Sequence, residues 1–146
     1  MIKTTTTLFK TLQAKATTFM PFRTFAVHMK YTKEHEWIKY DDTTHEAFIG
    51  ITDHAQSELG DIVHVEFNEP GDLSIGDALC TIESVKSTSE VFIPFNGTHL
   101  ESNKAVLDDV SQINQNAEGT WLHKVKVSDP GVINVLLTKE EYLKSL

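Results

Sequence analysis

One lysine stands out because of its position between two apolar segments. Lys86 lies in a short polar stretch between the apolar runs 77–82 and 91–95. A polar connection of this length between two strand-like runs is typical of a tight hairpin turn. Lys86 is also the only Lys or Arg between Lys39 and Lys104. The sequence therefore predicts an isolated ε-amine at an exposed hairpin tip. It is either an ordinary solvated lysine or a group presented to another enzyme for modification.

The second interpretation has a clear chemical basis. An amine that another enzyme acylates must enter the active site of that enzyme, and a projecting turn gives this access. The two flanking strands would hold the amine in a fixed direction. Acylation removes the positive charge and lengthens the side chain, which then becomes a tether for whatever group it carries. The rest of the chain must decide between the two interpretations.

Other residues that could do chemistry give weaker signals. The seven histidines are scattered, and the helix predicted at 52–60 holds no His-x-x-x-His pair with metal-ligand spacing. Cys80 is the only cysteine and lies in an apolar run, which favours a small buried side chain over a reactive thiol. The sequence contains no G-x-S-x-G nucleophile elbow and no phosphate-binding loop. We therefore expect no metal site, no catalytic residues and no enzyme activity of its own.

Short strands dominate the segments that must position Lys86. Alternating, β-branched or aromatic segments predict strands at 36–40, 45–51, 61–68, 77–82, 91–95 and 121–127. In the third of these, Ile62 and His64 are expected on one face and Val63 and Val65 on the other. The dipeptide Asn96-Gly97 predicts a further hairpin, because both residues tolerate a positive φ.

Two short helices have recognisable start signals. Thr52 or Asp53 can cap a helix that ends at Gly60, and Gln56 stands at capping-box spacing from Asp53. Thr138 opens a second capping box near the C-terminus. Together with the strands, these signals predict a mainly β fold, a barrel or sandwich, with a short internal helix and a C-terminal helix.

Charge is distributed unevenly along the 146 residues. Residues 1–26 hold four of the thirteen basic residues and no acidic one, so nine basic and twenty-one acidic residues fall in 27–146, a net charge of −12. Nucleic-acid phosphates would repel a body this acidic, so no nucleic-acid partner is expected. No run of eighteen apolar residues occurs, so we expect no membrane span.

The first 26 residues have the composition of a targeting segment. They are basic, rich in threonine, free of acids and weakly amphipathic, which is typical of an organellar transit peptide. A secretory signal would need a continuous apolar centre, and none is present. Arg23 shortly before Ala26 favours the mitochondrion over the plastid. We expect a mitochondrial transit peptide at 1–26, one domain at 27–146 and a location in the mitochondrial matrix. The alternative is an N-terminal tail without a targeting role.

An ordered series of short motifs runs through the body of the chain. The central one is Glu83-Ser84-Val85-Lys86. The others, in chain order, are His35-Glu36-Trp37, Gly50 to Gln56, Leu59-Gly60-Asp61, Val65-Glu66, Gly76-Asp77, Gly97, Gly119, Trp121-Leu122 and Glu141-Tyr142. This series resembles the glycine cleavage system H protein family of lipoyl carriers over about residues 30–146. The ordered set makes the resemblance specific, whereas the central tetrapeptide alone would not.

The resemblance implies a fold, a cofactor and a set of partners. The fold is a lipoyl/biotinyl-type hybrid of barrel and sandwich, and the cofactor is lipoic acid in amide linkage to Lys86. The implied function is to carry the aminomethyl group of glycine from the pyridoxal-phosphate glycine decarboxylase (P protein) to the tetrahydrofolate-dependent aminomethyltransferase (T protein). The flavin-dependent dihydrolipoamide dehydrogenase (L protein) and a lipoyl-attaching enzyme complete the expected partners.

The resemblance also implies a cleft that shelters the cationic aminomethyl group. Its candidate residues are Glu36, His54 and Glu90, with solvated surface acids as the alternative for the two glutamates. The sequence departs from the family pattern at Glu90, where Asp is usual, at Ser87, where Ala is usual, and in the loop 114–119, which lacks the usual Asp-Pro-Tyr. These departures bear on partner preference and loop shape rather than on lipoylation.

Three other functions are compatible with parts of the pattern. The chain could donate its lipoyl group for the lipoylation of 2-oxoacid dehydrogenases, alone or besides glycine cleavage. A biotin carrier is disfavoured, because Val85 and Ser87 stand where methionines usually flank the lysine. A stand-alone enzyme would have to use His54 and a carboxylate.

Overall fold

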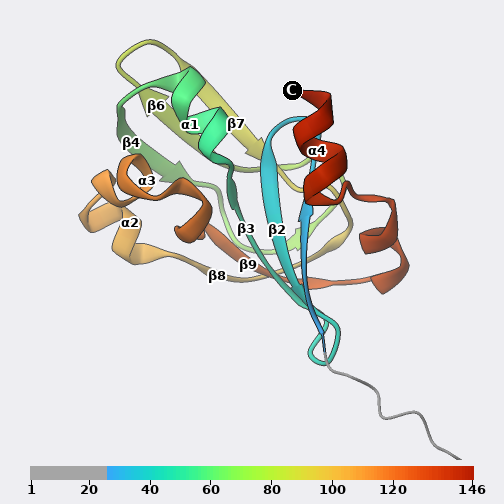
Figure 1. The fold of residues 1–146 in the computed structure, drawn as a ribbon. Helices are drawn as coiled ribbons and strands as arrows, with labels where there is room; N and C mark the ends of the chain where they lie inside the picture. Colours follow the sequence, from blue (N-terminus) through green and yellow to red (C-terminus); the bar gives the residue numbers. More distant parts are fainter. Residues whose placement is uncertain (1–25) are drawn as a thin grey trace, which may run out of the picture.

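Two antiparallel sheets form the body of the protein (Figure 1). The structure is a computed structural model that describes residues 26–146, so the predicted transit peptide lies outside the described residues except for Ala26. The larger sheet has the strand order β1 (Val27–Tyr31), β2 (Glu36–Asp41), β3 (Glu46–Ile51), β9 (His123–Val127), β8 (Gly97–Ser102) and β5 (Asp72–Leu73). The smaller sheet has the order β4 (Ile62–Phe67), β6 (Ala78–Ser84) and β7 (Thr88–Phe92).

Short helices connect and flank these strands. They are α1 (Asp53–Leu59), α2 (Lys104–Asp108), α3 (Ser111–Gln115), α4 (Lys139–Ser145) and the 3₁₀ helices η1 (Ala117–Gly119) and η2 (Pro130–Val135). Within residues 26–146, no helix has the length and apolar character needed to cross a membrane. The predicted internal and C-terminal helices correspond to α1 and α4.

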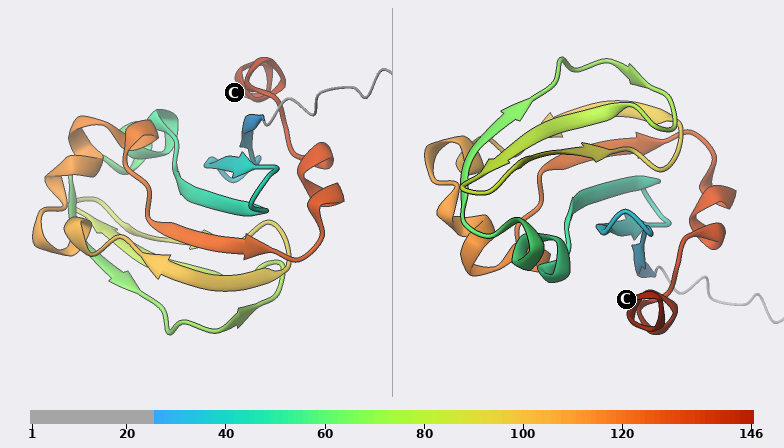
Figure 2. Two further views of the ribbon diagram at one scale, coloured as in Figure 1. Left: turned by 90° about the horizontal axis from the view of Figure 1, so that it is seen from below. Right: turned by 90° about the horizontal axis from the view of Figure 1, so that it is seen from above.

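The two sheets lie against each other (Figure 2), and side chains from both are buried in one hydrophobic cluster. Ile38 and Ile49 of the six-stranded sheet and Ile82 and Val91 of the three-stranded sheet are all buried in it. Cys80 lies in the same core, and burial raises the pKa of its thiol to about 12. The thiolate is the reactive form of cysteine. The structure thus supports the prediction of a buried, unreactive side chain at this position.

A smaller cluster attaches α4 to the outer strands. Tyr31 of β1, Trp37 of β2 and Tyr142 of α4 are buried together, and the rings of Tyr31 and Tyr142 stack with centroids 5.0 Å apart. The helix begins with the predicted capping box: the Glu141 amide donates to Thr138 Oγ1 at 3.3 Å, and the Thr138 amide donates to Glu141 Oε2 at 2.8 Å. Local capping and burial of one aromatic ring therefore fix this short helix.

The alternation predicted for 61–68 is wrong at its start. The pairing of β4 with β6 shifts register between Ile62 and His64, which marks a bulge. A bulge inserts one extra residue into a strand, so side chains before and after it exchange faces. Ile62 and Val65 are therefore both buried, while Val63 is 54% exposed.

The hairpin predicted at Asn96-Gly97 is wrong as well. The chain crosses here from the three-stranded sheet, which contains β7, to the six-stranded sheet, which contains β8. Asn96 Oδ1 accepts a hydrogen bond from the Ile75 amide at 2.8 Å and so fastens the crossing. A Cβ on Gly97 would collide with the carbonyl oxygen of Lys126. The glycine is needed for close approach to β9, not for a turn.

Candidate functional site

Lys86 lies in the loop that joins β6 to β7. Figure 1 shows the hairpin that these two strands form. The two strands pair from Ala78 opposite Phe92 to Glu83 opposite Thr88, and residues 85–87 form the connecting loop. The predicted position of the lysine is confirmed. The second strand, however, begins at Thr88 and ends at Phe92, earlier than the predicted span of 91–95. Pro94, which has no amide donor, therefore lies outside the strand.

Ser84 holds the loop in shape from inside. Its hydroxyl oxygen accepts hydrogen bonds from the amides of Lys86 at 3.2 Å and Ser87 at 3.1 Å, and its hydroxyl donates to the Ser87 carbonyl at 3.1 Å. The Ser84 amide also donates to the Ser87 carbonyl, at 2.8 Å. The serine hydroxyl thus uses its full hydrogen-bonding capacity within the turn. This arrangement orders the backbone of the lysine while leaving its side chain free.

The end of α1 supports the tip from outside. The Val85 amide donates to the carbonyl of Asp61 at 2.9 Å, which ties the loop to the start of β4. Gly60 ends α1 with φ 77° and ψ −153°, and the Lys86 side chain lies over it. A Cβ placed on Gly60 would come 3.2 Å from Lys86 Cε and 3.5 Å from Nζ. The missing side chain of this glycine therefore gives the lysine its room.

The start of α1 differs in detail from the prediction. Thr52 Oγ1 accepts a hydrogen bond from the Ala55 amide at 3.2 Å, so the N-cap residue of the helix is Thr52 rather than Asp53. Gln56 does not complete a capping box, because its side-chain amide donates to the Gly60 carbonyl at 3.2 Å. The helix is thus tied at its first turn by Thr52 and at its end by Gln56, which fixes the support under Lys86.

The surroundings of Lys86 suit an amine that is modified rather than one that catalyses. The side chain is exposed, and none of the ion pairs found within residues 26–146 involves it. Val85 beside it is an apolar side chain that is 66% exposed. A lysine that acts as a base or nucleophile is typically desolvated in an apolar pocket or placed beside another cationic group. Lys86 is exposed to solvent.

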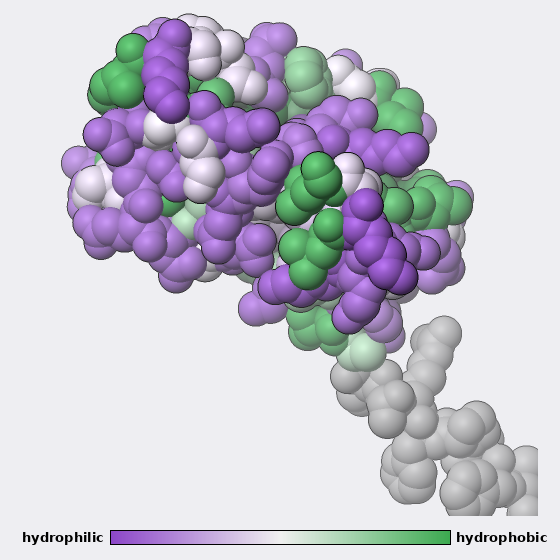
Figure 3. Space-filling model, turned by 45° about the horizontal axis from the view of Figure 1, so that its top comes forward, coloured by the Kyte–Doolittle hydropathy of each residue, from purple (hydrophilic) through white to green (hydrophobic). Residues whose placement is uncertain are grey.

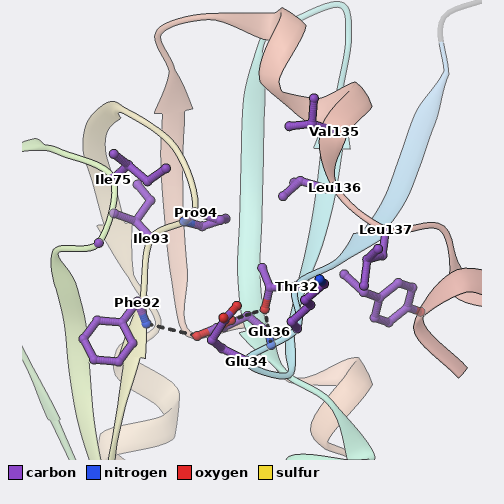
Figure 4. A pocket seen from close by; sticks show the side chains of 13 residues that line it. Thr32, Glu34, Glu36, Ile75, Phe92, Ile93, Pro94, Val135, Leu136 and Leu137 are labelled. Carbon is purple, nitrogen blue, oxygen red and sulfur yellow. Dashed lines mark hydrogen bonds between the residues drawn. The ribbon is translucent and has the colours of Figure 1, made fainter. Parts of the chain in front are cut away.

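A pocket of about 470 Å³ opens at the other end of β7 (Figure 4). Its wall is largely apolar and comes from the β1–β2 connection, the segment before β6, the crossing after β7 and the segment after η2. The labelled lining residues in Figure 4 are Thr32, Glu34, Glu36, Ile75, Phe92, Ile93, Pro94, Val135, Leu136 and Leu137. Ile75 and Val135, which line this pocket, are exposed apolar side chains. The face of the molecule drawn in Figure 3 is mostly hydrophilic, with smaller apolar patches.

Glu36 is a buried carboxylate at the inner end of this pocket. Its side chain belongs to a residue that is only 3% exposed. Oε1 accepts a hydrogen bond from the Phe92 amide at 3.2 Å, and Oε2 accepts one from the hydroxyl of Thr32 (Figure 4). Burial raises the pKa of Glu36 above its ordinary value, while the hydrogen bonds from Thr32 and Phe92 oppose this shift. The side chain therefore ties the end of β7 to β2, and the alternative of a solvated surface acid is wrong for it.

Glu90 lies between Lys86 and the pocket. It is exposed on β7, where the exposed residues Thr88, Glu90 and Phe92 alternate with the more buried ones. A fully extended chain places Glu90 at most about 14 Å, and Phe92 at most about 22 Å, from Lys86. The outward face of β7 thus leads from the lysine past Glu90 to the pocket that contains Glu36.

The third predicted cleft residue has different neighbours. His54 lies on α1, where its Nε2 is 3.4 Å from Glu58 Oε1, and its ring packs on that of His35 with centroids 4.6 Å apart. It is not among the residues that line the pocket. The structure therefore fastens Glu36 of β2 to Phe92, two residues after Glu90 on β7, but it does not place His54 near this part of β7.

Comparisons with known proteins decide the family. The model of the glycine cleavage H-protein family matches residues 29–146. The chain belongs to this family. The glycine cleavage system H protein of Thermoanaerobacter sp. (strain X514) is 45% identical over 117 residues, which are 80% of this chain and 91% of the relative. That of Dinoroseobacter shibae is 43% identical over 114 residues, covering 77% and 92%.

The family also has a solved structure that matches this fold. The crystal structure of a glycine cleavage system H protein from Mycobacterium marinum superposes with a TM-score of 0.71 at 32% identity, covering 82% of this chain and 96% of that one. The predicted fold class, mainly β with short helices, is confirmed.

Two supporting residues were not singled out from the sequence. Ser84 and Thr32 both use a side-chain hydroxyl to organise a turn. Serine and threonine in turns commonly do this, so the residue type in the turn was an available signal for Ser84. No comparable signal existed for Thr32, since its role depends on burial. Its hydroxyl accepts a hydrogen bond from the Glu36 amide and donates one to the Glu36 carboxylate.

Proposed function

We propose that the chain is a lipoyl carrier, which bears lipoic acid in amide linkage on Lys86 and carries the aminomethyl group of glycine between enzymes. The observation that supports this best is the exposed lysine held at an ordered hairpin tip in a member of the glycine cleavage H-protein family. Lys86 would hold lipoic acid through its Nζ, and the bound lipoic acid would supply a cyclic disulfide, the group that reacts by thiol–disulfide exchange. The chain itself works as a carrier subunit, not as an enzyme.

The residues around Lys86 fit a long acyl arm. The amine is exposed, Gly60 leaves space beside the side chain, and the loop backbone is fixed by Ser84. A modifying enzyme can therefore bind the tip without unfolding it. Tethering then raises the local concentration of the arm at each partner that the body of the protein binds.

The proposed partners divide the chemistry among themselves. A pyridoxal-phosphate glycine decarboxylase loads the carrier, a tetrahydrofolate-dependent aminomethyltransferase unloads it, a dihydrolipoamide dehydrogenase reoxidises it, and a lipoyl-attaching enzyme modifies Lys86. The acidic body, with a net charge of −12 over residues 27–146, would steer the carrier to basic surfaces on these enzymes. One carrier can thereby serve several partners.

The proposed location is the mitochondrial matrix. It is supported by the basic, acid-free composition of residues 1–26 and by the family match, which begins only at residue 29. A precursor segment that is removed on import would lie in this N-terminal part.

The experiment that tests the carrier function is intact-mass analysis of the full chain, expressed in cells with active lipoylation. We expect one lipoyl adduct, which peptide mapping assigns to Lys86 and which is lost in Lys86→Arg. Lys104→Arg is the matched control, because Lys104 is also exposed but lies at the start of α2. An unmodified wild-type chain from such cells would refute the proposal.

The path along β7 supports a sheltering role for Glu90 and Glu36. The cargo is a cationic amine, and Glu90 offers an exposed carboxylate between Lys86 and the pocket. Glu36 lines the pocket, and its carboxylate oxygens are the acidic groups at that end of the path. The contribution of His54 stays a prediction, because His54 does not line the pocket.

Replacing Glu90 by Gln is expected to leave lipoylation intact and to speed the loss of the aminomethyl group from the carrier. The increase should reach up to about fivefold, since an exposed ion pair contributes at most about 1 kcal/mol. The rate of ammonia release in the absence of the aminomethyltransferase measures this lifetime. Glu101→Gln, at an exposed position on β8, is the control. Equal lifetimes in Glu90→Gln and wild type would rule out the sheltering role of Glu90.

A further inference from the structure

Three side chains with metal-binding groups converge beside α1. The nearest ligand atoms of His35, His54 and Glu58 all lie within 4.8 Å of one another. His35 lies between β1 and β2, whereas His54 and Glu58 stand four residues apart on α1. Residues at this spacing lie on the same face of a helix. The fold therefore adds a third group from a distant segment to a local pair.

The separation within the helical pair suits a bound metal ion. His54 Nε2 and Glu58 Oε1 are 3.4 Å apart. This is longer than the usual range of hydrogen bonds to oxygen, about 2.7–3.2 Å. Two ligands of a tetrahedral zinc ion, each bonded at about 2.1 Å, lie about 3.4 Å apart. The helix thus holds two donors at the distance that one edge of a tetrahedral site requires.

The ring of His35 is oriented by a hydrogen bond from outside the three candidate ligands. Its Nδ1 is hydrogen-bonded to Tyr142 Oη at 2.8 Å, and the same hydroxyl is bonded to Thr52 Oγ1 at 2.9 Å. This leaves Nε2 of His35 available for a ligand. Metal-binding histidines are typically oriented in this way, through a hydrogen bond on the other ring nitrogen.

The backbone of His35 is held in an unusual conformation. Its φ is 73°, in the left-handed region that few residues other than glycine adopt. The Thr52 amide donates to the His35 carbonyl at 2.9 Å and keeps the residue in place. Residues held in sparsely populated conformations cluster at functional sites. Here the conformation brings the imidazole to α1.

We propose that His35, His54 and Glu58 bind a divalent transition-metal ion of the zinc class. Two imidazole nitrogens and one carboxylate oxygen are the donors that such ions prefer, whereas magnesium and calcium favour oxygen donors throughout. Three protein ligands leave a fourth position for water. The side chain of Glu58 is 63% exposed, so solvent reaches the cluster. The sequence led us to expect no metal site, because the predicted helix holds no histidine pair and one of the three ligands comes from another segment.

Metal binding at this cluster would join three parts of the fold. It would link the β1–β2 connection directly to α1, and through Tyr142 it would also involve α4. The helix α1 ends at Gly60, beneath the Lys86 side chain. The site would therefore stiffen the support of the hairpin tip, although the proposal does not depend on whether Lys86 is lipoylated.

Calorimetric titration of the full chain with zinc chloride tests this proposal. Lys86→Arg serves as the background, so that no lipoyl thiols can bind the metal. We expect one zinc ion per chain and a higher melting temperature in its presence. His54→Ala and Glu58→Gln should each weaken binding by more than about tenfold, since each removes one of three ligands. His64→Ala, at an exposed position on β4, should bind zinc like the background.

Two further measurements separate a true site from weak surface binding. Tyr142→Phe, which removes the hydrogen bond that orients His35, should lower zinc affinity about tenfold to hundredfold. Cobalt(II) in place of zinc should give the visible absorption of a four-coordinate ion, and this absorption should be lost in His54→Ala. Absence of saturable zinc binding would overturn the proposal. Equal affinities in His54→Ala and His64→Ala would overturn it as well.

Discussion

Lys86→Arg is expected to reduce glycine–bicarbonate exchange, in a system reconstituted with the glycine decarboxylase, to the level seen without carrier. The substitution keeps a long, positively charged side chain but removes the primary amine that is acylated. Lys86 contributes to the loop through its backbone amide, which donates to Ser84 Oγ, and arginine retains that amide. The fold of the hairpin should therefore persist while the function disappears completely.

The control for this loss is a variant of another exposed lysine. Lys104→Arg should support exchange at the wild-type rate, and circular dichroism should show the same strand content in both variants. Exchange sustained by Lys86→Arg, after lipoylation of the chain has been checked by mass, would show that another residue carries the arm. A different result would favour the donor role in the lipoylation of 2-oxoacid dehydrogenases. In that case the wild-type protein would be lipoylated and would donate its lipoyl group, but it would not support exchange.

The features that sequence analysis predicted correctly are those with local causes. The tip that presents Lys86 follows from two apolar runs and the polar residues between them, and the pairing of β6 with β7 confirms it. The start of α4 follows from Thr138 and Glu141, which are three residues apart and bond each other's amides. In each case the residues that determine the structure are neighbours in the chain, so one sequence is sufficient to find them.

The features that were missed depend on contacts between distant segments. The Glu36 carboxylate accepts the Phe92 amide across 56 positions, and nothing around Glu36 in the sequence indicates that it is buried. The same holds for His35, whose Nδ1 contacts Tyr142 across 107 positions. The Asn96-Gly97 prediction failed for a related reason, because a dipeptide that suits a tight turn also suits a crossing where two strands approach closely. Whether Asn-Gly forms a turn or a crossing is therefore decided by how the two sheets pack, which the dipeptide alone does not show.

Gly60→Ala is expected to lower the free energy of unfolding and to slow the lipoylation of Lys86. The φ of 77° and ψ of −153° at Gly60 fall in a region that is essentially restricted to glycine, so alanine should cost about 1–3 kcal/mol. The new Cβ would also lie 3.2 Å from Lys86 Cε. Because the end of a lysine side chain is flexible, we expect it to move aside rather than to clash. The amine would then leave the direction in which the hairpin presents it.

Two other glycines separate the backbone effect from the contact with Lys86. Gly76 also has a positive φ, of 89°, but a Cβ there would have no neighbour within 4 Å. Gly76→Ala should therefore lose stability in urea unfolding without any change in the rate of lipoylation. At Gly71, which has neither a positive φ nor a close neighbour, alanine should change neither property. If Gly60→Ala and Gly76→Ala were lipoylated at the same rate, contact between Gly60 and the lysine would have no part in presenting it. A slower rate in Gly60→Ala alone would show that α1 helps to aim the amine at its modifying enzyme.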